Sequence, residues 1–142
     1  MIRRNESSRC REMMKDDLMK VYREVVRKYE CRNNLEAFEM VVNSPAPRFY
    51  IDPRRAHQRI APMLRGDRSQ IEGLSPLRQE MYEALFDVVM RLWQKTNYWD
   101  KKLNYVLKFA VLEPAPRFYI TKNRMSQIWN ERSNKRRKEV LS

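Results

Sequence analysis

The sequence predicts an all-α protein made of two tandem trihelical repeats, and three observations lead to this prediction. The string PAPRFYI at residues 45–51 returns unchanged at residues 114–120, an offset of 69 in a chain of 142 residues. Such a repeat indicates two copies of one structural unit. Apolar residues before each string follow helical spacing. The chain has only two glycines, and both fall between the copies. The rest of the chain consists largely of helix-forming residues interrupted by prolines. We therefore expect two helix-turn-helix-like repeats packed into one compact body.

The first repeat is predicted over residues 11–65 and begins with two helices. Proline disfavours helical geometry in the residue before it, so Pro45 ends the second helix. Asp52 caps a third helix, which Pro62 shortens or kinks. The apolar positions of the three helices are, in order, Met14, Leu18, Val21, Val25 and Tyr29, then Leu35, Phe38 and Val42, then Ala56, Ile60 and Leu64.

The second repeat is predicted over residues 75–133, after a glycine-containing linker at residues 66–74. Ser75 followed by Pro76 is typical of a helix start. Pro114 ends the second helix of this copy, and Thr121 caps the third. A basic tail follows at residues 134–142. The apolar positions are Met81, Leu85, Val88, Val89 and Leu92, then Leu103, Leu107 and Val111, then Met125 and Trp129.

The repeated heptamer is best explained as a structural element. Its Pro-x-Pro segment holds the chain extended and fixes the exit from the second helix. Phe49 and Phe118 are expected to anchor this loop in the core. Arg48 and Arg117 alternate with them and are expected to point toward solvent or phosphate. The two RFYI segments can also pair as a short two-stranded ribbon.

Composition and charge narrow the function classes. The chain is 42% hydrophobic and 34% charged, which is a globular composition, and its net charge of +12 predicts a polyanionic partner. No apolar stretch is long enough to span a bilayer, and the N-terminal residues lack a signal-peptide core. Cys10 and Cys31 indicate free thiols in a reducing compartment, hence the cytoplasm, or the nucleoid if the protein is bacterial. His57 has no clustered partner, so we expect no metal and no cofactor.

The positive charge is concentrated in the heptamers and third helices. Residues 44–70 carry six basic and two acidic side chains, and residues 114–138 carry eight and one. The first two helices of each copy are nearly neutral. This layout is typical of trihelical DNA-binding units, in which two helices support a third that enters the major groove. A solvated charged face is the alternative, although such faces usually mix both signs.

Superposing the copies gives candidate contact residues. Arg55 falls on Arg124 and Gln58 falls on Gln127, in the first turns of the third helices. Arginine can bond guanine bidentately in the major groove, and glutamine can do the same with adenine. These matched pairs have three interpretations: the side chains contact bases, they contact phosphates, or the match reflects only the duplication. The predicted nucleic-acid-binding residues are Arg48, Arg54, Arg55, Gln58, Arg59, Arg117, Lys122, Asn123, Arg124, Gln127, Lys135, Arg136, Arg137 and Lys138.

The duplicated PAPRFY pattern resembles that of small basic proteins associated with mobile elements or prophages. The resemblance covers both copies of the motif, at residues 45–50 and 114–119. That group has no established activity, so the resemblance transfers no site residue. It implies a role in DNA transactions of a mobile element or phage.

Taken together, the sequence predicts a non-enzymatic protein that binds duplex DNA, acting as a regulator or accessory factor. No glycine-rich phosphate loop, metal-ligand spacing or nucleophile motif favours an enzyme. Two alternatives remain. The protein binds RNA or single strands, with Tyr98, Trp99 and Tyr105 stacking on bases, or it is an adaptor that docks an acidic partner. The sequence indicates no membrane and no small-molecule substrate, and it does not fix the oligomeric state.

Overall fold

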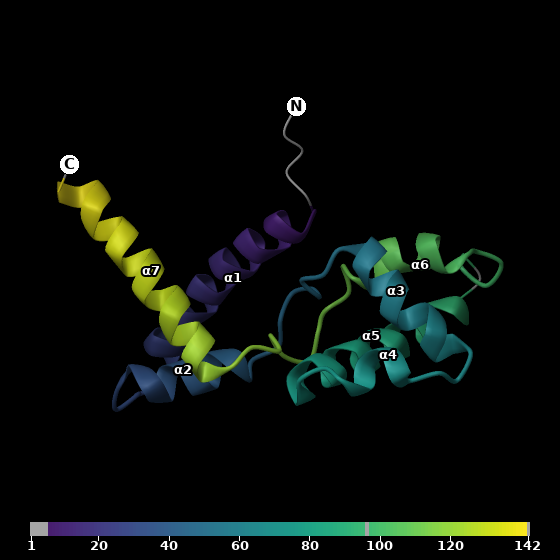
Figure 1. Ribbon diagram of the computed structural model, residues 1–142. Coiled ribbons are helices and arrows are strands. Elements are labelled where there is room, and N and C mark those ends of the chain that lie inside the picture. Colours follow the sequence, from purple (N-terminus) through teal and green to yellow (C-terminus); the bar gives the residue numbers. More distant parts are fainter. Residues whose placement is uncertain (1–5, 96, 142) are drawn as a thin grey trace.

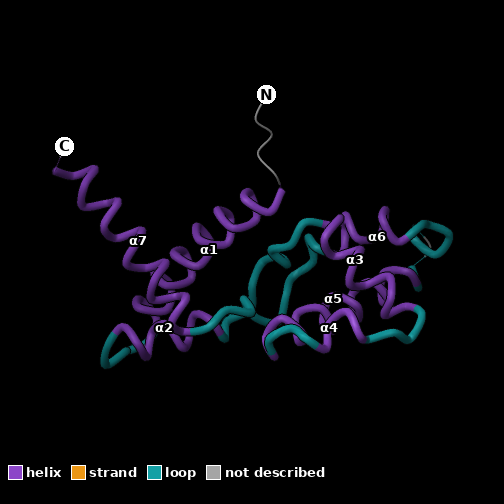
Figure 2. Tube along the Cα trace, in the orientation of Figure 1, coloured by secondary structure: helices purple, strands orange, loops and turns teal. Residues whose placement is uncertain are grey.

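The helices of the protein form two lobes joined by two loops (Figures 1 and 2). The computed structural model describes residues 6–95 and 97–141, which form seven helices and no strand. The first lobe holds α1 (Glu6–Lys28), α2 (Asn34–Val42) and α7 (Lys122–Leu141). The second holds α3 (Pro53–Leu64), α4 (Ser69–Glu72), α5 (Pro76–Trp93) and α6 (Leu103–Ala110). The predicted all-α class and the single compact body are confirmed.

Each third helix packs with the other copy. In the sequence α3 follows α1 and α2, yet it packs on α5 and α6, whereas α7 packs on α1 and α2. Within the described residues, α3 has no packing contact with α1 or α2. The lobes in space therefore differ from the predicted units 11–65 and 75–133. The reason lies in the heptamers, because an extended, proline-containing segment carries the chain across to the opposite lobe and does not fold it back.

The predicted helix starts are confirmed. Asp52, Ser75 and Thr121 each accept a hydrogen bond from a backbone N–H of the first turn, at 2.9, 3.4 and 3.1 Å. Such bonds satisfy donors that have no partner inside the helix. The predicted shortening of the first third helix is also confirmed, because α3 ends at Leu64, two residues after Pro62.

Two segments that the sequence analysis took as linker and tail contain helix. The short helix α4 lies inside the linker 66–74, and its Ile71 is buried in the core. Gly66 precedes it with φ +81°, a left-handed conformation that glycine adopts without strain. The basic segment after residue 133 continues α7 as far as residue 141. Ser142, the last residue of the predicted tail, lies outside the described residues.

The exchanged helices complete the core of each lobe. Ile60 of α3 is fully buried where that helix packs on α5 and α6, and Ile128 of α7 is fully buried in the first lobe. Trp129 packs its ring at 6.1 Å from Tyr22 and 5.9 Å from Phe38. Neither pair of first and second helices therefore has a complete core without the third helix of the other copy.

The two heptamers cross each other between the lobes, and we call residues 45–51 together with 114–120 the heptamer crossing. Ala46 and Ala115 exchange two backbone hydrogen bonds, each of 2.9 Å. This antiparallel pair is an isolated bridge. The predicted pairing of the RFYI segments is thus not what the described residues show, because the pairing ends before these segments and each turns toward a lobe.

The aromatic residues of the crossing make reciprocal contacts. The Phe49 ring stacks on Tyr119 at 6.4 Å, and the Phe118 ring stacks on Tyr50 at 5.9 Å. Phe49 and Phe118 are only 1% and 4% exposed, which confirms them as core anchors. Their backbone N–H groups donate to the ends of the opposite second helices, Phe49 to the Val111 carbonyl at 2.9 Å and Phe118 to the equivalent carbonyl of the first copy at 3.5 Å.

Candidate nucleic-acid interface

The first turns of α3 present polar side chains to solvent. Arg54, Arg55 and Gln58 are all exposed, while Ala56 and Ile60 of the same helix are completely buried. The apolar face therefore fixes the orientation of the helix and leaves the polar residues on its outer side. All three are predicted contact residues, and Arg55 also lines a cavity that is described below.

Arg59 differs from its neighbours on α3. Its side chain is half-buried, and its guanidinium donates a hydrogen bond to the backbone carbonyl of Gln70 in α4. This bond holds the positive charge against the second lobe. Arg59 thus ties α3 to α4 and contributes less to the outer surface than the sequence analysis expected.

The first turns of α7 carry the corresponding residues in the other lobe. Lys122, Asn123 and Gln127 are exposed. Arg124 is half-buried, and its guanidinium donates to the Gln127 side-chain oxygen at 3.2 Å. Lys122 lies 3.9 Å from a carboxylate oxygen of Glu39 in α2. An exposed pair at this distance contributes little energy, so Lys122 can exchange this partner for a phosphate.

Ion pairs fix the middle of α7 against α1. The Arg132 guanidinium lies 2.9 Å from Glu12 and 2.9 Å from Asp16. Lys15 of α1 donates to Glu131 at 3.0 Å, and this hydrogen bond lowers the pKa of the Glu131 carboxyl. These contacts lie on the α1 side of α7, which also packs on α2.

The last turns of α7 form a basic surface beside α1. This surface consists of four residues with exposed side chains, Lys135, Arg136, Arg137 and Lys138. The first two line a groove of about 620 Å³ between α1 and α7. Lys20 and Arg23 of α1 line the same groove, together with Asp16 and Glu139. Basic residues from both helices thus face a shared opening.

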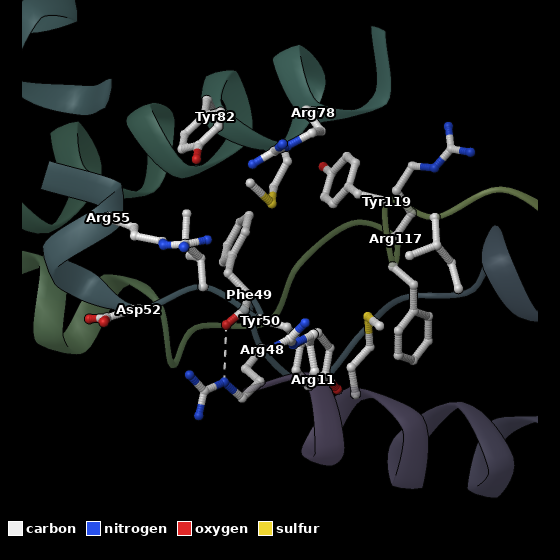
Figure 3. Close-up of a pocket in the computed structure, with 15 residues that line it drawn as sticks. Arg11, Arg48, Phe49, Tyr50, Asp52, Arg55, Arg78, Tyr82, Arg117 and Tyr119 are labelled. Carbon is white, nitrogen blue, oxygen red and sulfur yellow. Dashed lines mark hydrogen bonds between the residues drawn. The ribbon is translucent and has the colours of Figure 1, made fainter. Parts of the chain in front are cut away.

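The structure brings the heptamer arginines together in a cavity of about 350 Å³ at the heptamer crossing (Figure 3). Arg48 and Arg117 line it, and both are half-buried. Arg55 reaches it from α3. Arg124, which the superposition paired with Arg55, does not line this cavity and belongs to the first lobe. The predicted site residues therefore form separate surfaces, one on each lobe, with the cavity between them.

Sequence reasoning missed three residues of the cavity, Arg11 of α1 and Arg78 and Tyr82 of α5. A signal for the two arginines was present. At an offset of 67, Arg11 and Met14 return as Arg78 and Met81, and all four side chains line the cavity. The offset of 69 that aligns the heptamers hides this match.

The arginines of the heptamers have different partners. Arg48 donates through Nε to the Phe49 carbonyl at 3.0 Å and contacts the sulfur atoms of Met13 and Cys10 at 3.8 and 3.7 Å. Its guanidinium also lies 5.9 Å from the Tyr50 ring centroid. Arg117 lies 3.5 Å from a Glu80 carboxylate oxygen.

The two tyrosines of the crossing are also unequal. The Tyr50 hydroxyl donates to Asp17 at 2.6 Å, and burial together with this bond raises the pKa of Tyr50. Burial raises the pKa of Tyr119 as well. Tyr119 has φ +59°, the left-handed region that residues other than glycine rarely adopt. Strain of this kind is concentrated at functional sites, and here it lies at the cavity wall.

Comparisons with known proteins identify no relative: no protein-family model, no curated protein and no solved structure matches the chain. Among the helices of the described residues, none has the length and apolar character needed to cross a bilayer.

Proposed function

We propose that the protein binds duplex DNA without enzymatic activity and that α3 and α7 are its groove-binding helices. In this proposal each lobe is a helix-turn-helix-like unit, with two supporting helices from one copy and the third helix from the other. The observation that carries it is the exposure of Arg54, Arg55 and Gln58 on α3, and of Asn123 and Gln127 on α7, each set opposite a buried apolar face. Recognition helices present base-contacting residues in this manner.

The exchange of third helices supports a bivalent mode of binding. Because α3 completes the second lobe and α7 the first, the two helices belong to one body joined through the heptamer crossing. Two recognition helices held on one body act as a dimer does on neighbouring half-sites. In this proposal Arg55, Gln58, Arg124 and Gln127 contact bases, with the last two released from their mutual hydrogen bond.

The basic end of α7 supplies affinity that does not depend on sequence. Residues 135–138 place four exposed positive charges along the last turns of the helix. Each phosphate neutralised releases condensed counterions, so the logarithm of the binding constant falls by about 0.9 per phosphate for each decade of salt. In this proposal the protein acts in the cytoplasm, as a regulator or accessory factor of a mobile element or phage, and the resemblance of the PAPRFY pattern supports the second part.

The test is fluorescence anisotropy of the protein with labelled duplex DNA, single-stranded DNA and RNA, each across a salt series. Site selection first defines a preferred duplex. Arg55→Ala and Arg124→Ala are each expected to weaken the preferred duplex more than random duplex, by about tenfold for a lost bidentate base contact. Arg91→Ala, at an exposed position in the last turn of α5, is the matched control. Equal losses of affinity for both duplexes would contradict the assignment of base contacts to these arginines. Weak binding to all three nucleic acids overturns the proposal.

A second candidate function, single-strand or RNA binding, is favoured by an aromatic surface on α6. Trp99, in the turn that precedes α6, is 69% exposed, and Tyr105 and Phe109 of α6 are also exposed. The Tyr105 and Phe109 rings lie 5.2 Å apart, and the Lys101 ammonium lies 5.5 Å from the Tyr105 centroid. Aromatic rings next to positive charge are typical of single-strand platforms. Quenching of tryptophan fluorescence by single strands and not by duplex, lost in Trp99→Ala, would support this candidate.

A further inference from the structure

The cavity at the heptamer crossing is rich in guanidinium groups and poor in carboxylates. Five arginines from five different segments line it, and among the described residues that line it the one acidic side chain is Asp52. That carboxylate already accepts the backbone N–H of Arg54 at the start of α3. The lining arginines are Arg11, Arg48, Arg55, Arg78 and Arg117.

These positive charges have little internal compensation. Among the described residues, Arg55 and Arg78 have no carboxylate within ion-pair distance, and the side-chain contacts of Arg48 are to sulfur, a carbonyl and a ring. Arg117 has one pair at 3.5 Å, while its buried Nε has no hydrogen-bond partner in the described chain. Arg48 and Arg117 are half-buried, and the other three arginines are exposed. Like charges gathered around one opening repel one another, and an anion that enters it lowers this repulsion.

Tyr82 adds a polar group that is independent of the arginines. It lies on α5 and is 2% exposed as a whole residue. Tyr82 lines the cavity, so its hydroxyl is available to a ligand there. In Figure 3 the Tyr82 hydroxyl, Arg55 and Arg78 point toward the same space beside the Phe49 ring.

We propose that this cavity is a phosphate-binding site, in which phosphate oxygens accept hydrogen bonds from Arg55, Arg78 and the Tyr82 hydroxyl. Guanidinium groups match the geometry of phosphate oxygens and bind them bidentately. The volume of about 350 Å³ is that of a site for a small ligand. A free mononucleotide and a phosphate of a nucleic acid strand offer the same chemistry. The site shares Arg55 with the proposed groove-binding surface, whereas its other two donors, Arg78 and the Tyr82 hydroxyl, do not depend on groove binding by α3 and α7.

The experiment is isothermal titration of the full chain with inorganic phosphate, with AMP and with a 5′-phosphorylated single-stranded 12-mer beside its unphosphorylated form. Saturable binding at one site per chain is expected for at least one phosphate source. AMP binding identifies a free ligand, whereas binding of the 12-mer that requires its 5′-phosphate identifies a strand end. The absence of saturable binding to every probe overturns the proposal.

Variants locate the site. Arg78→Gln is expected to weaken phosphate binding at least tenfold, because a charge-assisted hydrogen bond is lost, and Tyr82→Phe is expected to weaken it several-fold. Arg91→Gln makes the same change at an exposed position near the other end of α5 and is expected to have no effect. Thermal unfolding shows that each variant is folded. Equal affinity in Arg78→Gln and Arg91→Gln overturns the assignment. Arg124→Ala, outside the cavity, separates the two proposals, because it is expected to weaken duplex binding and to leave phosphate binding intact.

Discussion

Replacement of Phe49 by alanine tests whether the heptamer crossing holds the two lobes together. The ring is 1% exposed and stacks on Tyr119. Truncation withdraws about 150 Å² of apolar surface from the core, which at about 25 cal/mol per Å² corresponds to about 4 kcal/mol. Measured Phe→Ala changes in cores fall in the same range, about 3–5 kcal/mol. Phe109→Ala, which truncates a ring that is 39% exposed, is the matched control and is expected to cost about 2 kcal/mol, because less of its apolar surface is buried.

The assay is urea unfolding followed by tryptophan fluorescence in variants that keep a single tryptophan. Trp129 reports on the first lobe and Trp93 on the second. Because each lobe contains a helix of the other copy, Phe49→Ala is expected to shift both transitions together to lower urea. A loss no greater than that of Phe109→Ala, or a shift confined to one lobe, would refute the role assigned to the crossing.

Three other outcomes are expected. The two halves of the chain, residues 1–74 and 75–142, should each be poorly helical by circular dichroism when they are produced separately. They should gain helicity when mixed, since each supplies the third helix that the other lacks. Full helicity of either half alone would contradict the exchange. Tyr50→Phe should cost about 1.5 kcal/mol at pH 7 through the lost bond to Asp17. The raised pKa of Tyr50 adds stability that is complete below about pH 10, the unfolded value, and is lost as the pH rises above it. The difference in unfolding free energy between the unsubstituted protein and Tyr50→Phe should therefore be smaller in urea titrations at pH 10.5 than at pH 7. An equal difference at both pH values would contradict the role of the Tyr50 hydroxyl. Arg132→Ala should cost about 1 kcal/mol, and the deficit in unfolding free energy should shrink as salt is raised, because both partner carboxylates are exposed.

The local features of the fold could be predicted because they depend on local chemistry. The caps at Asp52, Ser75 and Thr121 and the shortening by Pro62 follow from single side chains and their neighbours. The anchoring role of the heptamer phenylalanines follows from their size and apolar character. None of these properties depends on which lobe a helix joins.

The exchange of third helices could not be predicted, because it depends on which lobe each helix joins. The apolar face of α3, with Ile60 at its centre, requires an apolar partner surface, and two similar surfaces were available. The choice is made by the extended path of the heptamer, whose direction in space is a property of the folded chain. The offset of 67 marks Arg11 and Arg78 as equivalent positions, but their convergence on one cavity depends on that path as well.

The crossing also sets an order of events during synthesis. The first lobe requires α7, which begins at Lys122, so α1 and α2 leave the ribosome long before their partner helix exists. Until then Phe38 of α2 lacks the cover that Trp129 of α7 gives it. Nascent chains that wait with apolar surface exposed are prone to pair with one another. Two neighbouring nascent chains on one messenger could therefore exchange these helices between molecules, and the balance between single chains and such pairs would depend on the rate of translation.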